Sequence, residues 1–173
     1  MVKLLILLFS LNTFAQESIF PQFDFTQLTS FAPGKKVSEI PKSFGAPIQL
    51  EIKNAQEVKL YTIKNKDGYD YPIIIQHVDN EILDFYVRPP SYLLHDFFHR
   101  DLIKRYGKQN EYYFENGTGY YIWSNNEVDI YYSGECTISC FPVFYSQVAA
   151  KTKLPPTYKS IGKILEENLT LFE

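Results

Sequence analysis

The chain has little that would suit a nucleic acid, a bilayer or the commonest kinds of active site. Basic residues are not in excess, since 17 Lys and Arg face 20 Asp and Glu in 173 residues. Nucleic acid and acidic membrane surfaces are therefore poor candidates for partners. No apolar run reaches the roughly 18–20 residues that a spanning helix needs. Neither a glycine-rich phosphate loop nor a G-x-S-x-G motif is present, so we expect no catalytic role and no cofactor.

The first fifteen residues have the order of a secretory signal peptide. Lys3 precedes the apolar run 4–11, and Thr13 and Ala15 place small residues before Gln16. A membrane anchor is the alternative, but the apolar run is too short for one. We therefore predict cleavage after Ala15 and a secreted or periplasmic protein. The remaining 158 residues (173 − 15) suit one domain with its own core.

Cysteine is scarce, and its two copies lie close together at Cys136 and Cys140. In an exported protein the expected state of such a pair is a disulfide. Four residues of flat strand span about 13 Å, well beyond the roughly 7 Å that a bridge tolerates between Cα atoms. A disulfide therefore requires a turn or bulge at residues 137–139. The catalytic alternative is disfavoured because redox sites use C-x-x-C, and three residues intervene here.

Aromatic residues, by contrast, are abundant, with 14 Tyr and 14 Phe. Residues 111–145 hold three Tyr-Tyr pairs, the only Trp, and turn signals at Asn116-Gly117 and Asn125-Asn126 that predict antiparallel hairpins. Alternation along a strand places one ring of each pair on each face of the sheet. One set can fill a core, and the other can form a recognition face. The candidate binding residues are Tyr113, Tyr121, Trp123, Tyr131 and Tyr132; which face is exposed depends on the register.

The remaining pattern predicts an α+β fold, an antiparallel sheet with short helices packed on one face. Residues 16–36 read as an extended arm with a short helix at 26–31. A short helix at 38–45 and a longer one at 91–107 each end at a glycine. A last helix is expected at 157–169. Strands are predicted at 48–52, 58–63, 71–78 and 82–87, and the aromatic hairpins at 111–147. The divisions are thus an arm at 16–36, helix-plus-meander units at 37–90 and 91–150, and a C-terminal helix within 151–173.

Short matches between the two units suggest an internal repeat. Ile40-x-x-x-Phe44-Gly45 matches Leu102-x-x-x-Tyr106-Gly107, and Asn80-Glu81-Ile82-x-x-Phe85-Tyr86 matches Asn126-Glu127-Val128-x-x-Tyr131-Tyr132. A helix with a glycine cap followed by an antiparallel meander, given twice, resembles the tandem fold of β-lactamase inhibitor protein (BLIP). A single-unit version occurs in BamE-like envelope lipoproteins. The resemblance covers roughly residues 37–147. It implies a non-catalytic domain that binds another envelope or extracellular protein.

His95 and His99 offer an enzymatic alternative, a zinc-dependent hydrolase. Two histidines four residues apart on a helix share a face, and their spacing copies H-E-x-x-H with Asp96 in place of Glu. Asp is one methylene shorter than the base that this motif needs. Both histidines are also expected on the polar, solvated side of a helix whose apolar stripe contains Leu94, Phe98 and Leu102. We therefore predict no metal site.

Overall fold

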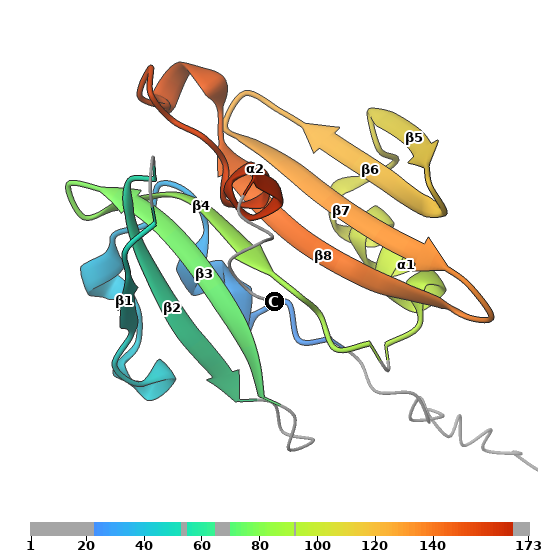
Figure 1. Cartoon of the computed structure of the whole chain (residues 1–173), viewed down its shortest axis with the longest axis horizontal. Helices are drawn as coiled ribbons and strands as arrows, with labels where there is room; N and C mark the ends of the chain where they lie inside the picture. Colours follow the sequence, from blue (N-terminus) through green and yellow to red (C-terminus); the bar gives the residue numbers. More distant parts are fainter. Residues whose placement is uncertain (1–22, 53–54, 65–69, 92, 168–173) are drawn as a thin grey trace, which may run out of the picture.

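The protein is described by a computed structural model covering residues 23–52, 55–64, 70–91 and 93–167 (Figure 1). The described strands form one antiparallel sheet in the order β1-β2-β3-β4-β8-β7-β6-β5, so two four-stranded meanders meet through β4 and β8. The strands are β1 (Ile48–Leu50), β2 (Glu57–Lys64), β3 (Asp70–Val78), β4 (Glu81–Val87), β5 (Glu111–Glu115), β6 (Thr118–Ser124), β7 (Val128–Cys136) and β8 (Cys140–Ala149). The predicted α+β class and antiparallel sheet are confirmed, while the signal-peptide prediction lies outside the described residues.

The core lies on one side of the sheet, which we call the closed face. The helix α1 (His95–Tyr106) and the 3₁₀ turn η1 (Gln27–Phe31) cover it, together with the chain before η1. Phe98 of α1 stacks on Tyr132 at 5.0 Å between ring centroids, and Phe25 packs on Phe98 at 4.9 Å. Burying several such rings stabilises the fold by about 2–3 kcal/mol each, before conformational entropy is subtracted.

The predicted α-helix at 38–45 is not present, but the segment does end at Gly45 as predicted. Two 3₁₀ turns, η2 (Val37–Glu39) and η3 (Lys42–Phe44), replace a continuous α-helix. Pro41 lies between them, and proline disfavours helical backbone at the residue before it. Gly45 ends the segment with φ of +79°, a region that glycine enters without steric cost. Ile40 and Phe44 do pack inward, as expected.

Helix α1 begins later than predicted and presents a different face. Its first residue is His95, so Ser91 does not cap it, while Gly107 ends it as expected. Its buried residues are His95, Phe98 and Leu102. The prediction that His95 and His99 face solvent is wrong. His95 is buried, and tyrosine hydroxyls of the sheet lie at hydrogen-bond distance from it, while His99 is half-buried and packs its ring on Tyr121. Leu94, placed in the predicted apolar stripe, is 40% exposed.

Helix α2 (Ile161–Glu167) packs on the opposite side of the sheet, which we call the open face. The expectation that all helices share one face therefore fails for this element. Asp84 of β4 accepts hydrogen bonds from the Ile161 backbone N–H at 2.9 Å and from the Tyr158 hydroxyl at 2.7 Å. The predicted cap Thr157 lies before the helix, and the predicted end beyond Glu167 lies outside the described residues. Helix α2 packs on β4 and β3, and in Figure 1 it lies over the middle of the sheet and leaves β5 and β6 uncovered.

The repeated sequence motifs do not all fall on equivalent positions of the two meanders. Gly45 and Gly107 both precede a first strand, β1 and β5. In the other match, however, Asn80 lies in the turn between β3 and β4 and Glu81 begins β4, whereas Asn126-Glu127 lies between β6 and β7. The match at residues 80–86 therefore lies at the third hairpin of the first meander, whereas the match at residues 126–132 lies at the second hairpin of the second meander.

Cys136 and Cys140 close the tip of the β7–β8 hairpin. Their sulfur atoms lie at disulfide distance, 2.11 Å, and the two residues are partners in the strand register. The intervening residues 137–139 form the tight loop that the sequence required.

Reduction of this bridge is expected to cost about 2 kcal/mol of unfolding free energy, because so small a ring constrains the unfolded chain only slightly. Urea denaturation with and without reductant measures the change, with the Cys136→Ser/Cys140→Ser protein as the control that reductant should not affect. A loss of folding on reduction would contradict this local role.

Candidate functional site

A groove of about 240 Å³ lies on the open face, between the aromatic strands and α2. Its floor follows the strand register. Tyr113 of β5 is paired with Tyr120 of β6, and Tyr120 with Ser133 of β7. Ser133 in turn pairs with Phe144 of β8. Because Ser133 is small, the large rings on either side of it can lean toward each other across β7.

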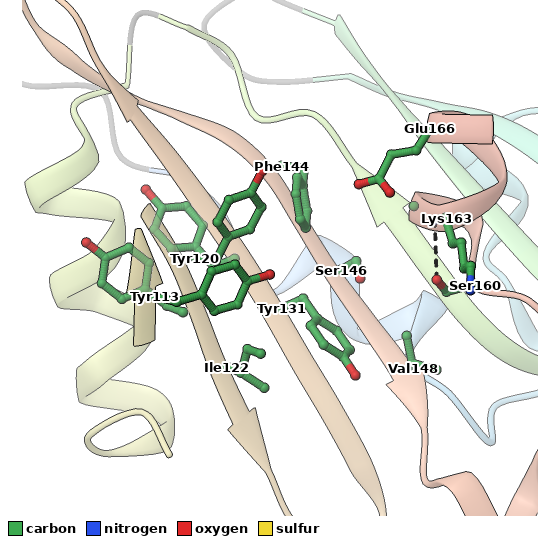
Figure 2. Close-up of a pocket in the computed structure, with 13 residues that line it drawn as sticks. Tyr113, Tyr120, Ile122, Tyr131, Phe144, Ser146, Val148, Ser160, Lys163 and Glu166 are labelled. Atoms are coloured by element: carbon green, nitrogen blue, oxygen red, sulfur yellow. Dashed lines mark hydrogen bonds between the residues drawn. The ribbon is translucent and has the colours of Figure 1, made fainter. Parts of the chain in front are cut away.

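The rings of the groove form a nearly continuous aromatic surface. Tyr113 and Tyr120 stack with centroids 4.7 Å apart and planes at 10°, and Phe144 lies 6.5 Å from Tyr120. Tyr86 continues the surface by stacking on Phe144 at 5.4 Å. Figure 2 shows Tyr113, Tyr120, Tyr131 and Phe144 projecting from the same side of the strands. Such a surface offers large, rigid contact area with polar tips, as recognition surfaces commonly do.

The second wall of the groove is charged and comes from the C-terminal segment. Ser160, Gly162, Lys163 and Glu166 line it, and in Figure 2 the Glu166 side chain extends from α2 toward the aromatic rings. The Lys163 backbone N–H donates to Ser160 Oγ at 3.4 Å, so Ser160 caps the first turn of α2. Asp84 and Tyr158 hold this wall against the sheet.

Acidic side chains surround the groove. The register places Glu111 beside Ile122, Glu115 and Glu135 on either side of Thr118, and Asp129 beside Ser124, all on the open face. Burial raises the pKa of Tyr120, and the charges of Tyr113, Glu166, Glu115 and Glu135 raise it further. Burial and then Glu115, Glu166 and Glu111 do the same to the pKa of Tyr113. The groove therefore has a negative potential, with Lys163 as its one basic lining residue among the described ones.

The five candidate binding residues are divided between the two faces. Tyr113 and Tyr131 line the open groove. Tyr132 and Trp123 are 0% and 3% exposed on the closed face, beneath α1, so neither side chain is available to a partner in this conformation. Trp123 Nε1 donates to the Gly107 carbonyl at 2.8 Å, which ties β6 to the end of α1. Tyr121 also projects toward the closed face, where it packs on His99 at 4.1 Å.

The histidine pair belongs to a buried tyrosine–histidine cluster. His95 Nδ1 lies 2.7 Å from the Tyr132 hydroxyl, and His95 Nε2 lies 3.3 Å from the Tyr121 hydroxyl. Burial lowers the pKa of His95; it also lowers that of His99, where the charge of His95 adds to the effect. Both ring nitrogens of His95 thus have hydroxyl partners. Among the described residues, no three metal-ligating side chains come together.

Sequence reasoning missed several residues of the groove. Tyr120, Ile122 and Phe144 line it beside Tyr113 and Tyr131, with Ser160, Lys163 and Glu166 opposite. Alternation along β6 would have grouped Tyr120 and Ile122 with the open face, once that face was known. Nothing in the local sequence indicates that α2 approaches this side of the sheet.

The fold and the groove define an antiparallel sheet domain with an uncovered aromatic surface on its open face. No helix of the described chain is long and apolar enough to cross a membrane. No family model matches the chain, and neither the curated proteins nor the solved structures contain a match. The site must therefore be interpreted from its own geometry.

Proposed function

We propose that this is an exported, non-catalytic domain that binds another envelope or extracellular protein through its open aromatic groove. The observation that carries the proposal is the unequal covering of the sheet. The closed face is filled by α1 and the N-terminal segment, while Tyr113, Tyr120, Tyr131 and Phe144 gather on the other side without a helix over them. Uncovered aromatic surface of this kind is typical of interaction sites.

Two further features support the proposal. The cysteine pair at disulfide distance is compatible with an oxidising compartment outside the cytoplasm. The two meanders also each follow a glycine-capped segment, which supports their being pseudo-repeats of one helix-plus-meander unit, as in the BLIP and BamE-like folds. In such a two-unit sheet, the aromatic strands of the groove belong to the second unit, and α2 forms the opposite wall of the groove.

The test is capture of a partner by immobilised mature chain from an envelope or extracellular extract, compared across three proteins. Tyr131→Ser removes a groove ring, and Ile48→Ser removes an exposed apolar side chain from β1, at the far edge of the sheet. We expect wild type and Ile48→Ser to retain the same partner. Tyr131→Ser should weaken retention about tenfold or more, as loss of a central aromatic contact does.

The urea midpoints of all three proteins must agree, so that lost binding is not lost folding. Equal retention of the partner by all three proteins would overturn the proposal. It would also be overturned if no captured protein showed saturable binding to the wild-type chain.

A further inference from the structure

The strand β5 is an open edge of the sheet. It pairs only with β6 among the described strands, and all five of its residues are exposed. The two-residue turn at Asn116-Gly117, with φ of +50° and +85°, makes Glu115 and Thr118 a hydrogen-bonded pair. Alternation then gives Tyr113 and Glu111 their backbone hydrogen bonds toward β6. The peptide groups of Tyr112 and Phe114 therefore point away from the sheet.

This edge carries aromatic side chains on both faces. Tyr113 faces the groove and stacks on Tyr120 at 4.7 Å. Tyr112 faces the other way and packs on Tyr121 at 4.9 Å, and Phe114 is 61% exposed. Exposed edge strands are usually blunted by charge, proline or a bulge, because they template pairing with other chains. Here the only such device is a glutamate at each end, Glu111 and Glu115.

The two glutamates decide which kind of strand can be added. A second copy pairing antiparallel about Tyr113 would bring Glu111 opposite Glu115 of the other copy, and like charges in that position are destabilising. Glu135 and Glu166 add to the negative charge on the same face. A strand with lysine or arginine on that face meets carboxylates and tyrosine rings together, and long cationic side chains can pack their stems along such rings.

We propose that β5 is a strand-addition site for an extended, basic segment of the partner protein. The partner backbone pairs with the outward peptide groups of Tyr112 and Phe114. Its alternate Lys or Arg side chains lie over Tyr113 between Glu111 and Glu115, and its other side chains contact Tyr112 and Phe114. This inference rests on the proposed function, since it extends the groove surface by one strand and names the chemistry of what binds there.

The experiment uses a synthetic peptide of alternating lysine and threonine, titrated into the isotope-labelled mature chain and followed by backbone amide NMR. We expect the largest shift changes at residues 112–115 and weaker binding as salt is raised, because exposed ion pairs are screened. The matched peptide with glutamate in place of lysine should give no change at β5. Absence of binding by the lysine peptide, or equal binding by the glutamate peptide, overturns the proposal.

Two variants at one position separate backbone pairing from side-chain contact. Phe114→Thr and Phe114→Pro both remove the exposed ring, but only proline removes the outward N–H, and neither removes a donor to β6. We expect Phe114→Pro to bind the lysine peptide about tenfold more weakly than Phe114→Thr. Proline removes the N–H at position 114 that would donate to the added strand, and it weakens the adjacent hydrogen bonds to that strand. Equal affinities of the two variants would rule out strand addition.

The two proposals fail in distinguishable ways. Capture of a partner that depends on Tyr131 but is equal for Phe114→Pro and Phe114→Thr supports the groove and overturns strand addition. Peptide pairing along β5, with partner capture insensitive to Tyr131→Ser, supports the basic strand site and overturns the groove as the main contact.

Discussion

Replacement of Gly134 by alanine is expected to lower the free energy of unfolding by about 1–3 kcal/mol, the usual cost of forcing atoms into a packed core. A Cβ at this position would overlap His95 Nδ1 and lie 2.9 Å from His95 Cε1. The imidazole has little freedom to retreat. Its Nδ1 is hydrogen-bonded to the Tyr132 hydroxyl at 2.7 Å, and its ring stacks on Tyr132 at 5.5 Å. Urea denaturation of the two proteins measures the loss.

Gly162→Ala is the matched control. A Cβ at Gly162 would lie 3.9 Å from Tyr86, an ordinary contact, and the residue is helical. Alanine favours a helix over glycine by up to about 1 kcal/mol, so this variant should be neutral or slightly more stable. In a His95→Ala background, which vacates the contested space, Gly134→Ala should cost much less than in wild type. If Gly134→Ala and Gly162→Ala change stability alike, the His95 packing described above is incorrect.

The strands were predictable because their signals are local. Asn116-Gly117 and Asp79-Asn80 sit at turns where the backbone adopts positive φ, which asparagine, aspartate and glycine tolerate. The β-branched and aromatic runs on either side then became the paired strands, within one or two residues of the predicted ends. The close cysteine pair indicated its own loop for a similar reason, since strand geometry alone forbids a bridge across four extended residues.

The faces of the elements were not predictable in the same way. His95 reads as polar in any hydropathy pattern, and only the hydroxyls of Tyr121 and Tyr132, more than twenty residues away, make its burial favourable. The division of the Tyr-Tyr pairs was correctly anticipated. Which ring of each pair is buried depends on where α1 lies, which is a long-range contact. The same holds for α2, whose position depends on Asp84 in β4.

The stability of the protein is expected to fall as pH rises through about 7, and Asp84→Asn should remove most of that fall. Asp84 is 1% exposed, and burial raises its pKa to about 7, despite hydrogen bonds from Ile161, Tyr158 and Gln76 that lower it. The folded chain therefore holds this proton more tightly than the unfolded chain, whose aspartate pKa is about 4. The resulting stabilisation is complete below about pH 4 and is lost as pH rises through about 7.

About three pK units correspond to on the order of 4 kcal/mol at most, which urea denaturation between about pH 4 and pH 8 can detect. Other groups titrate in this range, and His95 and His99, whose pKa values burial lowers, favour folding as pH rises. The informative quantity is therefore the difference between wild type and Asp84→Asn at each pH. Asparagine replaces one acceptor of the Ile161, Tyr158 and Gln76 donors at every pH, so the prediction concerns the change with pH: relative to wild type, the variant should be more stable at pH 8 than in acid. A difference that does not change with pH would contradict the buried, proton-binding carboxyl.

The effect should be largest where Asp84 makes its contacts. Its carboxylate holds the Tyr158 hydroxyl and the first amide of α2, so an unfavourable buried charge is relieved most simply by release of that segment. Protection of the Ile164 amide from hydrogen exchange should then fall above pH 7 in wild type but not in Asp84→Asn, whereas the Tyr132 amide in the core serves as the reference. Because α2 forms one wall of the groove, its release on ionisation of Asp84 would expose more of the aromatic surface. The affinity for the partner should therefore differ between pH 6 and pH 8, and this difference should be larger in wild type than in Asp84→Asn.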